Sequence, residues 1–160
     1  MSSQVLSTQE VSDATQTAWV RFLRAHAALT RELSARLEAD HALTMSDFDV
    51  LIQLYHAEDH AMRRVDIARS VLLTASGITR LLDGLERCGL VAKKSCSTDA
   101  RVSYAVLTEE GLRKVEDARK SHQADIDELF GARLKPKERE QFAELLGRLP
   151  LAHTTEQCSA

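Results

Sequence analysis

Residues 74 to 111 constrain the fold of this chain more than any other stretch. They begin with Thr-Ala-Ser-Gly-Ile-Thr-Arg, which mixes small polar and apolar residues, and they reach Gly89 after the length of a short helix. A glycine at that point suits the left-handed backbone that ends many helices. A basic segment, a polar loop that ends at Arg101 and a return segment follow. This order predicts a winged helix-turn-helix, an element that usually binds DNA.

The rest of the chain has the apolar spacing of long helices. Only two prolines occur, and Pro136 is the first of them. The spacing predicts helices at about 14–39, 64–70, 74–88 and 108–130, one that follows Ser46 as its N-cap, and a last one that begins at Pro136. Thr74 is the expected N-cap of the helix at 74–88. Long helices should therefore dominate the fold.

The expected β-structure is small. Two strands at 91–96 and 104–107 should form a hairpin, and the polar segment 56–62 should be a loop. The predicted class is mainly α with a small β-hairpin wing, a winged helix-turn-helix with helices on both sides of it in the sequence.

Charge is distributed unevenly along the chain. The net charge is -3, which by itself argues against a nucleic-acid partner. Between Arg63 and Arg101, however, eight basic residues stand against four acidic ones, so this centre carries +4 and the remainder -7. A basic centre within acidic surroundings fits a protein that meets phosphate with one face. The alternative is uneven surface charge without functional meaning.

Length and composition exclude several classes of protein. At 160 residues, 44% of them hydrophobic and 28% charged, the chain fits one globular domain with a core of its own. No apolar run approaches the ~18 residues of a membrane span. The N-terminus also lacks the apolar centre of a signal peptide. We therefore expect a cytoplasmic protein without a membrane partner.

The helix after Thr74 combines the two faces that a major-groove reader needs. Thr74, Ser76 and Thr79 can donate hydrogen bonds to phosphates or bases, and Arg80 can bond to guanine edges with two N–H groups. Gly77 has no side chain and would let the backbone approach DNA closely. The alternative for Gly77 is a residue that only weakens the helix, by about 1 kcal/mol relative to alanine. Apolar residues occupy the opposite face: Ile78, Leu81, Leu82 and Leu85.

The expected hairpin carries further DNA-binding candidates. Asp99 and Arg101 stand two apart, so in extended chain they share a side and the carboxylate can orient the guanidinium. An oriented arginine at a hairpin tip suits the narrow, negative minor groove, with Lys93 and Lys94 as flanking phosphate contacts. The alternative is a solvated hairpin with an ordinary surface ion pair, which would contribute about 0–1 kcal/mol.

Two motifs in this region resemble the signature of a known family. Asp99-x-Arg101-x5-Leu107-Thr108-x-x-Gly111 is similar to the wing motif of MarR-family transcription regulators. Leu85-Glu86-Arg87-x-Gly89-Leu90-Val91 resembles the end of their recognition helix. The order of helices and hairpin agrees as well, over roughly residues 14–149. The chain departs from many members at Val102, where they have a second basic residue, and at Gly77 and Gly84, which make this helix more pliable.

The resemblance implies a homodimer that binds double-stranded DNA. It assigns 14–45 and 108–149 to dimerisation helices and 46–107 to the DNA-binding lobe, while 1–13 should be a disordered arm and 150–160 a flexible tail. It also implies a pseudo-palindromic operator with one recognition helix per half-site. Most members repress transcription, and many release DNA when they bind a small, often aromatic acid. The chain would then be a ligand-responsive repressor without a cofactor.

Effector pockets in this family lie between the dimerisation helices and the DNA-binding lobe. The resemblance implies a ligand site with these candidate lining residues: Trp19, Phe22, Leu23, His26, Phe48, Ile52 and Tyr55. His26 follows Trp19 by seven positions and Phe22 by four, so the three share a helix face and the histidine can pair with an anion. The alternative for each residue is ordinary core packing.

Other functions stay open at this point. Cys88 and Cys96 flank the end of the recognition helix and the first wing strand, so they can form a redox switch or be inert thiols. His56 and His60, with His41 nearby, have a spacing that can hold a metal on a helix, but their segment is polar like a loop and we expect no metal. A winged helix that binds protein instead of DNA is a further alternative. No nucleophile elbow, phosphate loop, dinucleotide fingerprint or CxxC pair occurs, so we expect no enzyme.

Overall fold

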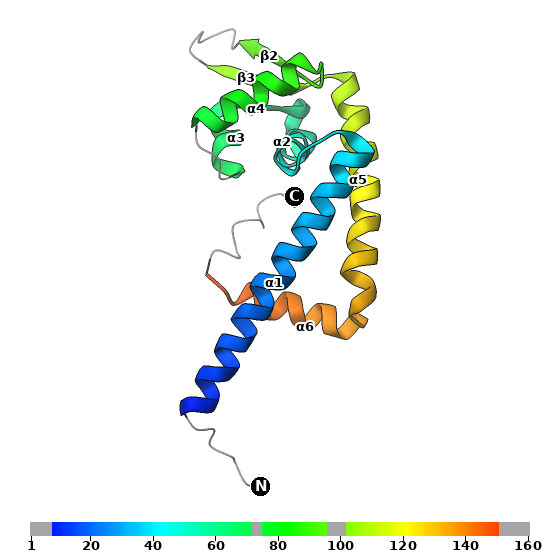
Figure 1. The fold of residues 1–160 in the computed structure, drawn as a ribbon. Coiled ribbons are helices and arrows are strands. Elements are labelled where there is room, and N and C mark those ends of the chain that lie inside the picture. Colours follow the sequence, from blue (N-terminus) through cyan, green and yellow to red (C-terminus); the bar gives the residue numbers. More distant parts are fainter. Residues whose placement is uncertain (1–7, 72–74, 96–101, 151–160) are drawn as a thin grey trace.

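The computed structural model describes residues 8–71, 75–95 and 102–150 (Figure 1). In chain order its elements are α1 (Thr8–His41), α2 (Met45–His56), the 3-10 turn η1 (Glu58–His60), β1 (Ala61–Arg63), α3 (Arg64–Ser70), α4 (Ala75–Arg87), β2 (Val91–Ser95), β3 (Ser103–Leu107), α5 (Glu109–Leu129), the 3-10 turn η2 (Gly131–Arg133) and α6 (Pro136–Gly147). The fold is mainly α, and the segment from α2 to β3 forms a winged helix-turn-helix lobe. This confirms the predicted class.

The sheet contains a strand, β1, that was not predicted from the sequence. Its order is β1-β3-β2, and both pairs are antiparallel. The segment 56–62 was predicted as a loop, and this is wrong for most of it, because His56 ends α2, 58–60 form η1, and 61–62 belong to β1. The chain turns into β1 through Asp59 and His60, whose φ angles of 53° and 52° lie in the left-handed region. Neither residue is glycine, so the sequence gives little sign of such a turn.

The turn between α1 and α2 is built by Thr44. The predicted N-cap, Ser46, is wrong, because Ser46 lies inside α2. Thr44 Oγ1 accepts a hydrogen bond from the Asp47 backbone N–H at 3.1 Å, and Asp47 Oδ2 accepts one from the Thr44 N–H at 3.0 Å. Two reciprocal bonds satisfy more free backbone donors than a single cap would. Helix α1 itself begins at Thr8, so part of the expected disordered arm is helical.

The hydrophobic core lies in the winged-helix lobe. Its largest fully buried side chains come from α2, α3, α4 and α5: Val50, Leu51, Leu54, Ile67, Leu82 and Val115. Helix α1 reaches this core near its C-terminal end, where Leu37 is buried. Helix α4 is therefore held in place by packing against several other elements of the structure.

Helices α1 and α5 run side by side away from the lobe (Figure 1). Arg36 of α1 joins them, because its Nη1 donates to Asp125 at 2.8 Å and to Glu128 at 3.0 Å. The bond with Arg36 lowers the pKa of Glu128, and the three acidic partners of Arg36, led by Glu128, raise the pKa of its guanidinium. These ion pairs connect α1 with α5.

Large apolar side chains are exposed at the end of the molecule far from the lobe. They lie on the N-terminal half of α1 and on or just after α6: Trp19, Leu23, Phe142, Leu145 and Leu149. Figure 1 shows α6 crossing the stalk of α1 and α5 at this end. Across the described ranges, every helix is too short or too polar to span a bilayer.

Candidate nucleic-acid interface

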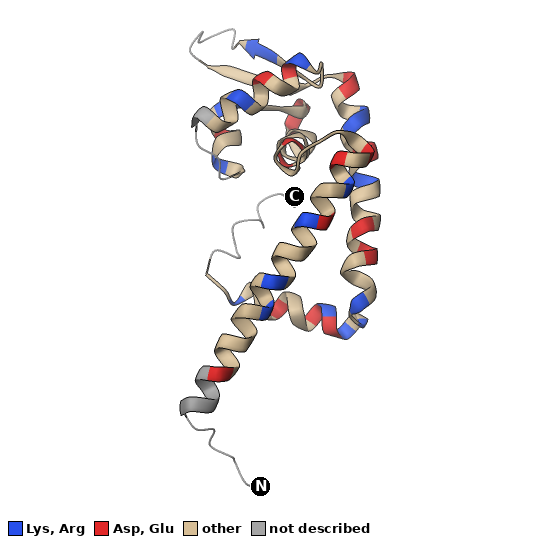
Figure 2. Ribbon diagram, viewed as in Figure 1, with Lys and Arg blue, Asp and Glu red and all other residues tan. Residues whose placement is uncertain are grey.

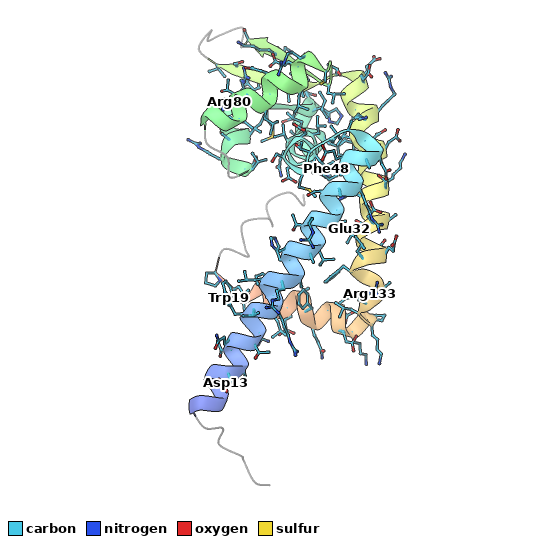
Figure 3. All side chains as sticks on the ribbon, viewed as in Figure 1. Asp13, Trp19, Glu32, Phe48, Arg80 and Arg133 are labelled. Carbon is cyan, nitrogen blue, oxygen red and sulfur yellow. The ribbon has the colours of Figure 1, made fainter. Side chains whose placement is uncertain are left out.

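Helix α4 has one buried face and one exposed face. Ile78, Leu82 and Leu85 are buried against the lobe, at the helical spacing that the sequence predicted. Thr79 and Arg80 are exposed on the other side. Figure 3 shows Arg80 on the outer surface of the lobe. The helix can thus present a long hydrogen-bond donor while its apolar side stays anchored.

Arg64 of α3 holds α3 and α4 together. Its Nη2 donates to Asp83 Oδ1 of α4 at 3.0 Å and lies 4.0 Å from Glu86 Oε1. Its side chain is only 20% exposed, so the contact is partly sheltered from water. Arg64 was counted among the basic residues between Arg63 and Arg101, but its charge is paired with Asp83 inside the lobe. This bracing role could not be predicted from the sequence, because Arg64 and Asp83 are far apart in the chain.

The free positive charge of the lobe is concentrated on α4 and β2. Arg63 and Arg69 both pair with Asp66, at 2.9 Å and 3.6 Å. Within the described part of the chain, by contrast, no carboxylate lies within ion-pair distance of Arg80, Lys93 or Lys94. Figure 2 shows the lysines as a blue segment of β2, next to α4. These cations are available for an anionic partner such as phosphate.

Lys93 and Lys94 point to opposite faces of the sheet, since neighbouring residues in a strand alternate. Lys93 stands opposite the buried Ala105, on the face that carries the core. Lys94 stands opposite Tyr104 of β3, and Tyr104 is also the partner of Arg63 in β1 on its other side. Both lysines are exposed, because β2 is an edge strand. Both were predicted as phosphate contacts that flank Arg101, and this geometry gives them different surroundings.

The C-terminal end of α4 is fixed by a glycine and then by the start of α5. Gly89 has a φ of 73°, and the Leu90 N–H bonds to the Leu85 carbonyl while the Gly89 N–H bonds to that of Glu86, both at 3.0 Å. This is the Schellman arrangement, and it confirms the predicted helix stop. Thr108 Oγ1 donates to the Gly89 carbonyl at 2.6 Å and accepts from the Gly111 N–H at 3.0 Å. One threonine thus connects the end of α4 to α5.

Several candidate DNA contacts lie outside the described residues. Thr74, Asp99 and Arg101 fall there, so the proposed pairing at the wing tip stays a prediction. The backbone of Ser76 belongs to α4, but its side chain is outside the description. Gly77 is partly buried in the first turns of α4.

The candidate effector residues fall into two groups in the single chain. The rings of Trp19, Phe22 and His26 follow one another along α1, with centroids 6.2 Å and 6.3 Å apart, while Leu23 beside them is exposed. Trp19 and Leu37 are separated by 18 residues, or about 27 Å of helix. The first group therefore lies far from the lobe core.

The second group lies on α2, against α5. The Phe48 ring is 4.9 Å from the His122 ring, Ile52 is partly buried beside the core, and Arg119 lies 5.3 Å from the Tyr55 ring centroid. A pocket that combines this group with Trp19 requires a second subunit, so it stays a prediction. Figure 3 labels Trp19 and Phe48 at well-separated points of the molecule.

His122 lies where α5 packs against α2, and its pKa is lowered. Its Nδ1 is buried and has no hydrogen-bond partner among the described residues. Burial lowers the pKa of His122, and the carboxylates of Asp125 and Asp49 oppose this only partly. Burial also raises the pKa of Asp49. His122 was not among the site residues predicted from the sequence.

The other candidate chemistries have limited support. His41 Nε2 lies 2.5 Å from Ser121 Oγ, and His60 Nδ1 lies 2.9 Å from the Tyr55 carbonyl. Among the described residues no group of three His, Cys, Asp or Glu side chains could hold a metal. Cys88 is exposed with a free thiol. Cys96 is outside the described residues, so a bridge to it stays untested.

Comparisons with known proteins agree with this architecture. The sequence model of the MarR family matches residues 43–103. The HTH-type transcriptional regulator MhqR of Bacillus subtilis (strain 168) is 36% identical over 111 residues, which are 69% of this chain and 74% of MhqR. The HTH-type transcriptional repressor YetL of the same organism is 31% identical over 111 residues, 69% of this chain and 66% of YetL. AbsC, a MarR family transcriptional regulator from Streptomyces coelicolor, superimposes with a TM-score of 0.76 at 28% identity over 90% of this chain and 93% of AbsC.

Proposed function

The chain belongs to the MarR family of DNA-binding transcription regulators, and from this membership we propose that it binds a pseudo-palindromic operator as a homodimer. Helix α4 of each subunit enters the major groove of one half-site. The observation that carries this proposal is the exposed face of α4. Arg80 stands there without an ion pair among the described residues, opposite the buried Ile78, Leu82 and Leu85.

Each DNA-binding candidate has a proposed role. Arg80 reads a guanine edge, and small polar or side-chain-free positions at the start of the helix allow close approach: Thr74, Ser76, Gly77 and Thr79. Lys93 and Lys94 bind phosphates, and Arg101, oriented by Asp99, enters the minor groove. Both lysines are exposed on an edge strand, which supports their part of the proposal.

The dimer forms through the helices outside the lobe, 14–45 and 108–149. The large apolar side chains exposed on α1 and on or just after α6 support this division, because exposed apolar surface of this size on a single chain commonly marks an interface. The Arg36 ion pairs hold α1 against α5 within each subunit and so fix the distance from the interface to the lobe. The protein acts where operator DNA is, in the cytoplasm.

The regulator represses transcription and leaves the operator when a small aromatic acid binds. The relative YetL is named a transcriptional repressor, which supports repression over activation. The aromatic and histidine side chains of α1 and α2 support the ligand class, since a dimer can bring Trp19, Phe22, Leu23 and His26 of one subunit near Phe48, Ile52 and Tyr55 of the other.

A salt titration tests DNA binding directly. Fluorescence anisotropy of the full chain with duplex DNA from upstream of its own gene should give an affinity that falls steeply as salt rises, because bound cations release counterions. Lys94→Ala should make that dependence shallower, whereas Lys120→Ala, in α5 and 73% exposed, serves as the charge-matched control. A winged helix that binds only protein would show no duplex affinity at any salt concentration.

A further inference from the structure

The packing of α5 against α2 encloses a ring nitrogen that has no hydrogen-bond partner. Phe48 of α2 is buried, and its ring centroid lies 4.9 Å from that of His122 of α5. The Nδ1 atom of His122 is also buried, and among the residues that the structure describes it has no hydrogen-bond partner. Figure 3 labels Phe48 where the lobe meets α1 and α5. Such an atom is uncommon in folded proteins and requires an explanation.

Two carboxylates act on the His122 imidazole, one from each helix. Asp49 follows Phe48 on α2, and Asp125 lies three residues after His122, about one turn along α5. Both carboxylates attract a protonated His122. Asp49 forms no ion pair within the described ranges, so its charge is available. We name Phe48, Asp49, His122 and Asp125 together the α2–α5 joint.

Asp125 also belongs to a cluster with more negative than positive charge. Arg36 of α1 donates to Asp125 at 2.8 Å, to Glu128 at 3.0 Å and to Glu32 at 3.1 Å. Three carboxylates thus share one guanidinium. The Asp125 side chain is only 18% exposed, so its charge is weakly screened by solvent. A proton on His122 would reduce the excess of negative charge in this cluster.

Two further titratable groups lie near His122 without bonding to it. Arg119 stands three residues earlier on α5, and its guanidinium lies 5.3 Å from the centroid of the Tyr55 ring of α2, a cation–π contact. His41 of α1 meets Ser121, the neighbour of His122, with 2.5 Å between Nε2 and Oγ. In the described part of the chain, neither Arg119 nor His41 forms a hydrogen bond with His122. The carboxylates of Asp49 and Asp125 are therefore the partners that a charged His122 has nearby.

The joint has different requirements for neutral and for protonated His122. A neutral imidazole can pack against the Phe48 ring, whereas an imidazolium has two N–H donors and a charge that burial disfavours. Burial accordingly lowers the pKa of His122. An imidazolium can bond to Asp49 or Asp125 from Nδ1 only if its ring moves away from Phe48, because Nδ1 has no partner in the packed joint. The joint thus has two alternative arrangements, selected by one proton.

We propose that the α2–α5 joint is a proton-driven switch, in which protonation of His122 separates its ring from Phe48 and lowers the affinity for the operator. Helix α2 belongs to the lobe and α5 to the stalk, so the joint determines how the lobe is held. Two half-sites are bound together only when both lobes keep a fixed separation. The effect on DNA rests on the proposed function, whereas the switch within the chain does not.

The pH range of the switch follows from the sign of the shift. Because the pKa of His122 in the folded protein lies below the usual 6.5, the packed joint is complete above pH 6.5. It opens as the pH falls towards the pKa of the folded protein. A change of pH in the mildly acidic range is therefore the signal.

Histidine NMR of the full chain tests the switch without DNA. The chain holds six histidines, and the imidazole signal that is absent from His122→Gln belongs to His122. Its titration midpoint should lie below 6.5, and Asp49→Asn should lower it further by removing an attracting carboxylate. The ring signals of Phe48 should shift with the same midpoint. A midpoint at or above 6.5, or Phe48 signals that ignore the titration, would overturn the proposal.

Operator binding is measured separately, at constant ionic strength between about pH 7.5 and pH 5.5. The duplex that the full chain selects from a random pool is compared with a scrambled duplex of equal length by fluorescence anisotropy. In wild type the preference for the operator should fall severalfold on acidification, and in His122→Gln it should stay constant. His41→Gln is the matched control, because His41 contacts the same turn of α5, and it should behave as wild type does.

The outcomes separate the two proposals. If wild type binds no duplex at any pH, the proposed function fails, and the signals of His122 and Phe48 still decide the switch. If Phe48 responds to protonation of His122 while wild type and His122→Gln keep equal operator preference at every pH, the coupling to DNA is wrong.

Discussion

The carbonyl oxygen of Leu90 occupies the space where a side chain at Gly111 would begin. A β-carbon built on Gly111 would come within 1.9 Å of that oxygen and 2.9 Å of its carbon. The same carbonyl accepts a hydrogen bond from the Thr108 N–H at 3.1 Å. Helix α5 can therefore start beside the end of α4 only if residue 111 is glycine. This contact joins the DNA-binding lobe to the stalk.

Replacing Gly111 by alanine should destabilise the protein strongly. The clash involves backbone, which cannot move aside as a side chain can, and overpacking of this kind costs about 1–3 kcal/mol or more. Urea unfolding at fixed protein concentration measures the change. Gly84→Ala is the matched control, because its β-carbon meets nothing, and it should leave stability equal or higher. Equal stability of wild type and Gly111→Ala would show that α5 does not start this close to α4.

Thr108 should contribute to stability through its hydroxyl and not its methyl group. The hydroxyl caps α5 and donates to the Gly89 carbonyl, and loss of such a cap costs about 0.5–2 kcal/mol. Thr108→Ala and Thr108→Val should both lose this amount in urea unfolding, whereas Thr108→Ser should recover most of it. If valine is as stable as threonine, the cap contributes nothing measurable.

Local signals explain why much of the lobe could be predicted. The boundaries of α3 agree with the sequence, and Gly89 ends α4 as expected, because spacing and a left-handed glycine act within a few residues. The motif at Thr108 and Gly111 resembled a family signature, and the structure gives its physical basis in the contact with Leu90. The order of elements followed from these local rules.

Features that depend on distant partners could not be predicted. Strand β1 exists because Ala61–Arg63 pair with β3, more than forty residues later in the chain. Arg64 is neutralised by Asp83, which the count of charges along the sequence could not reveal. The set of effector residues came from the family resemblance, and helix spacing placed only Trp19, Phe22 and His26 on one face, which does not show whether two helices bring the whole set together.

A charge in the proposed dimer interface should separate the subunits. Leu145 of α6 is 56% exposed in the single chain. Burying a leucine contributes about 1.5–3 kcal/mol, so Leu145→Asp should weaken dimerisation at least about tenfold by sedimentation velocity. Val65 of α3 is 53% exposed but lies in the lobe, and Val65→Asp should leave the dimer intact. The interface lies elsewhere if Leu145→Asp sediments like wild type.

His122 should make the protein less stable in acid. Burial holds its pKa below the usual 6.5, so below that pH the unfolded chain binds a proton that the folded chain resists. The contribution of His122 to the free energy of unfolding is fully present above pH 6.5, and it is lost as the pH falls towards the pKa of His122 in the folded protein. Asp49, whose pKa is raised from 3.8, acts in the opposite direction at lower pH.

The variant His122→Gln isolates this effect. Melting temperatures of wild type and variant should diverge between about pH 7.5 and pH 5.5, with wild type losing more on acidification. Asp49→Asn serves as a second reference, since its melting temperature should still fall on acidification, as that of wild type does. Parallel curves for wild type and His122→Gln would mean that His122 titrates normally in the folded protein.

The central claim is that α4 reads DNA bases through Arg80 in a two-fold symmetric complex. Selection of duplexes from a random pool by the full chain tests it most directly, with Arg80→Ala run in parallel. Wild type should enrich an inverted repeat with half-site centres about 10 base pairs apart, and Arg80→Ala should lose the preference at one symmetric position, a loss of about 1–3 kcal/mol. The account would be contradicted if wild type enriches no inverted repeat, or if Arg80→Ala enriches the same repeat with the same base preferences.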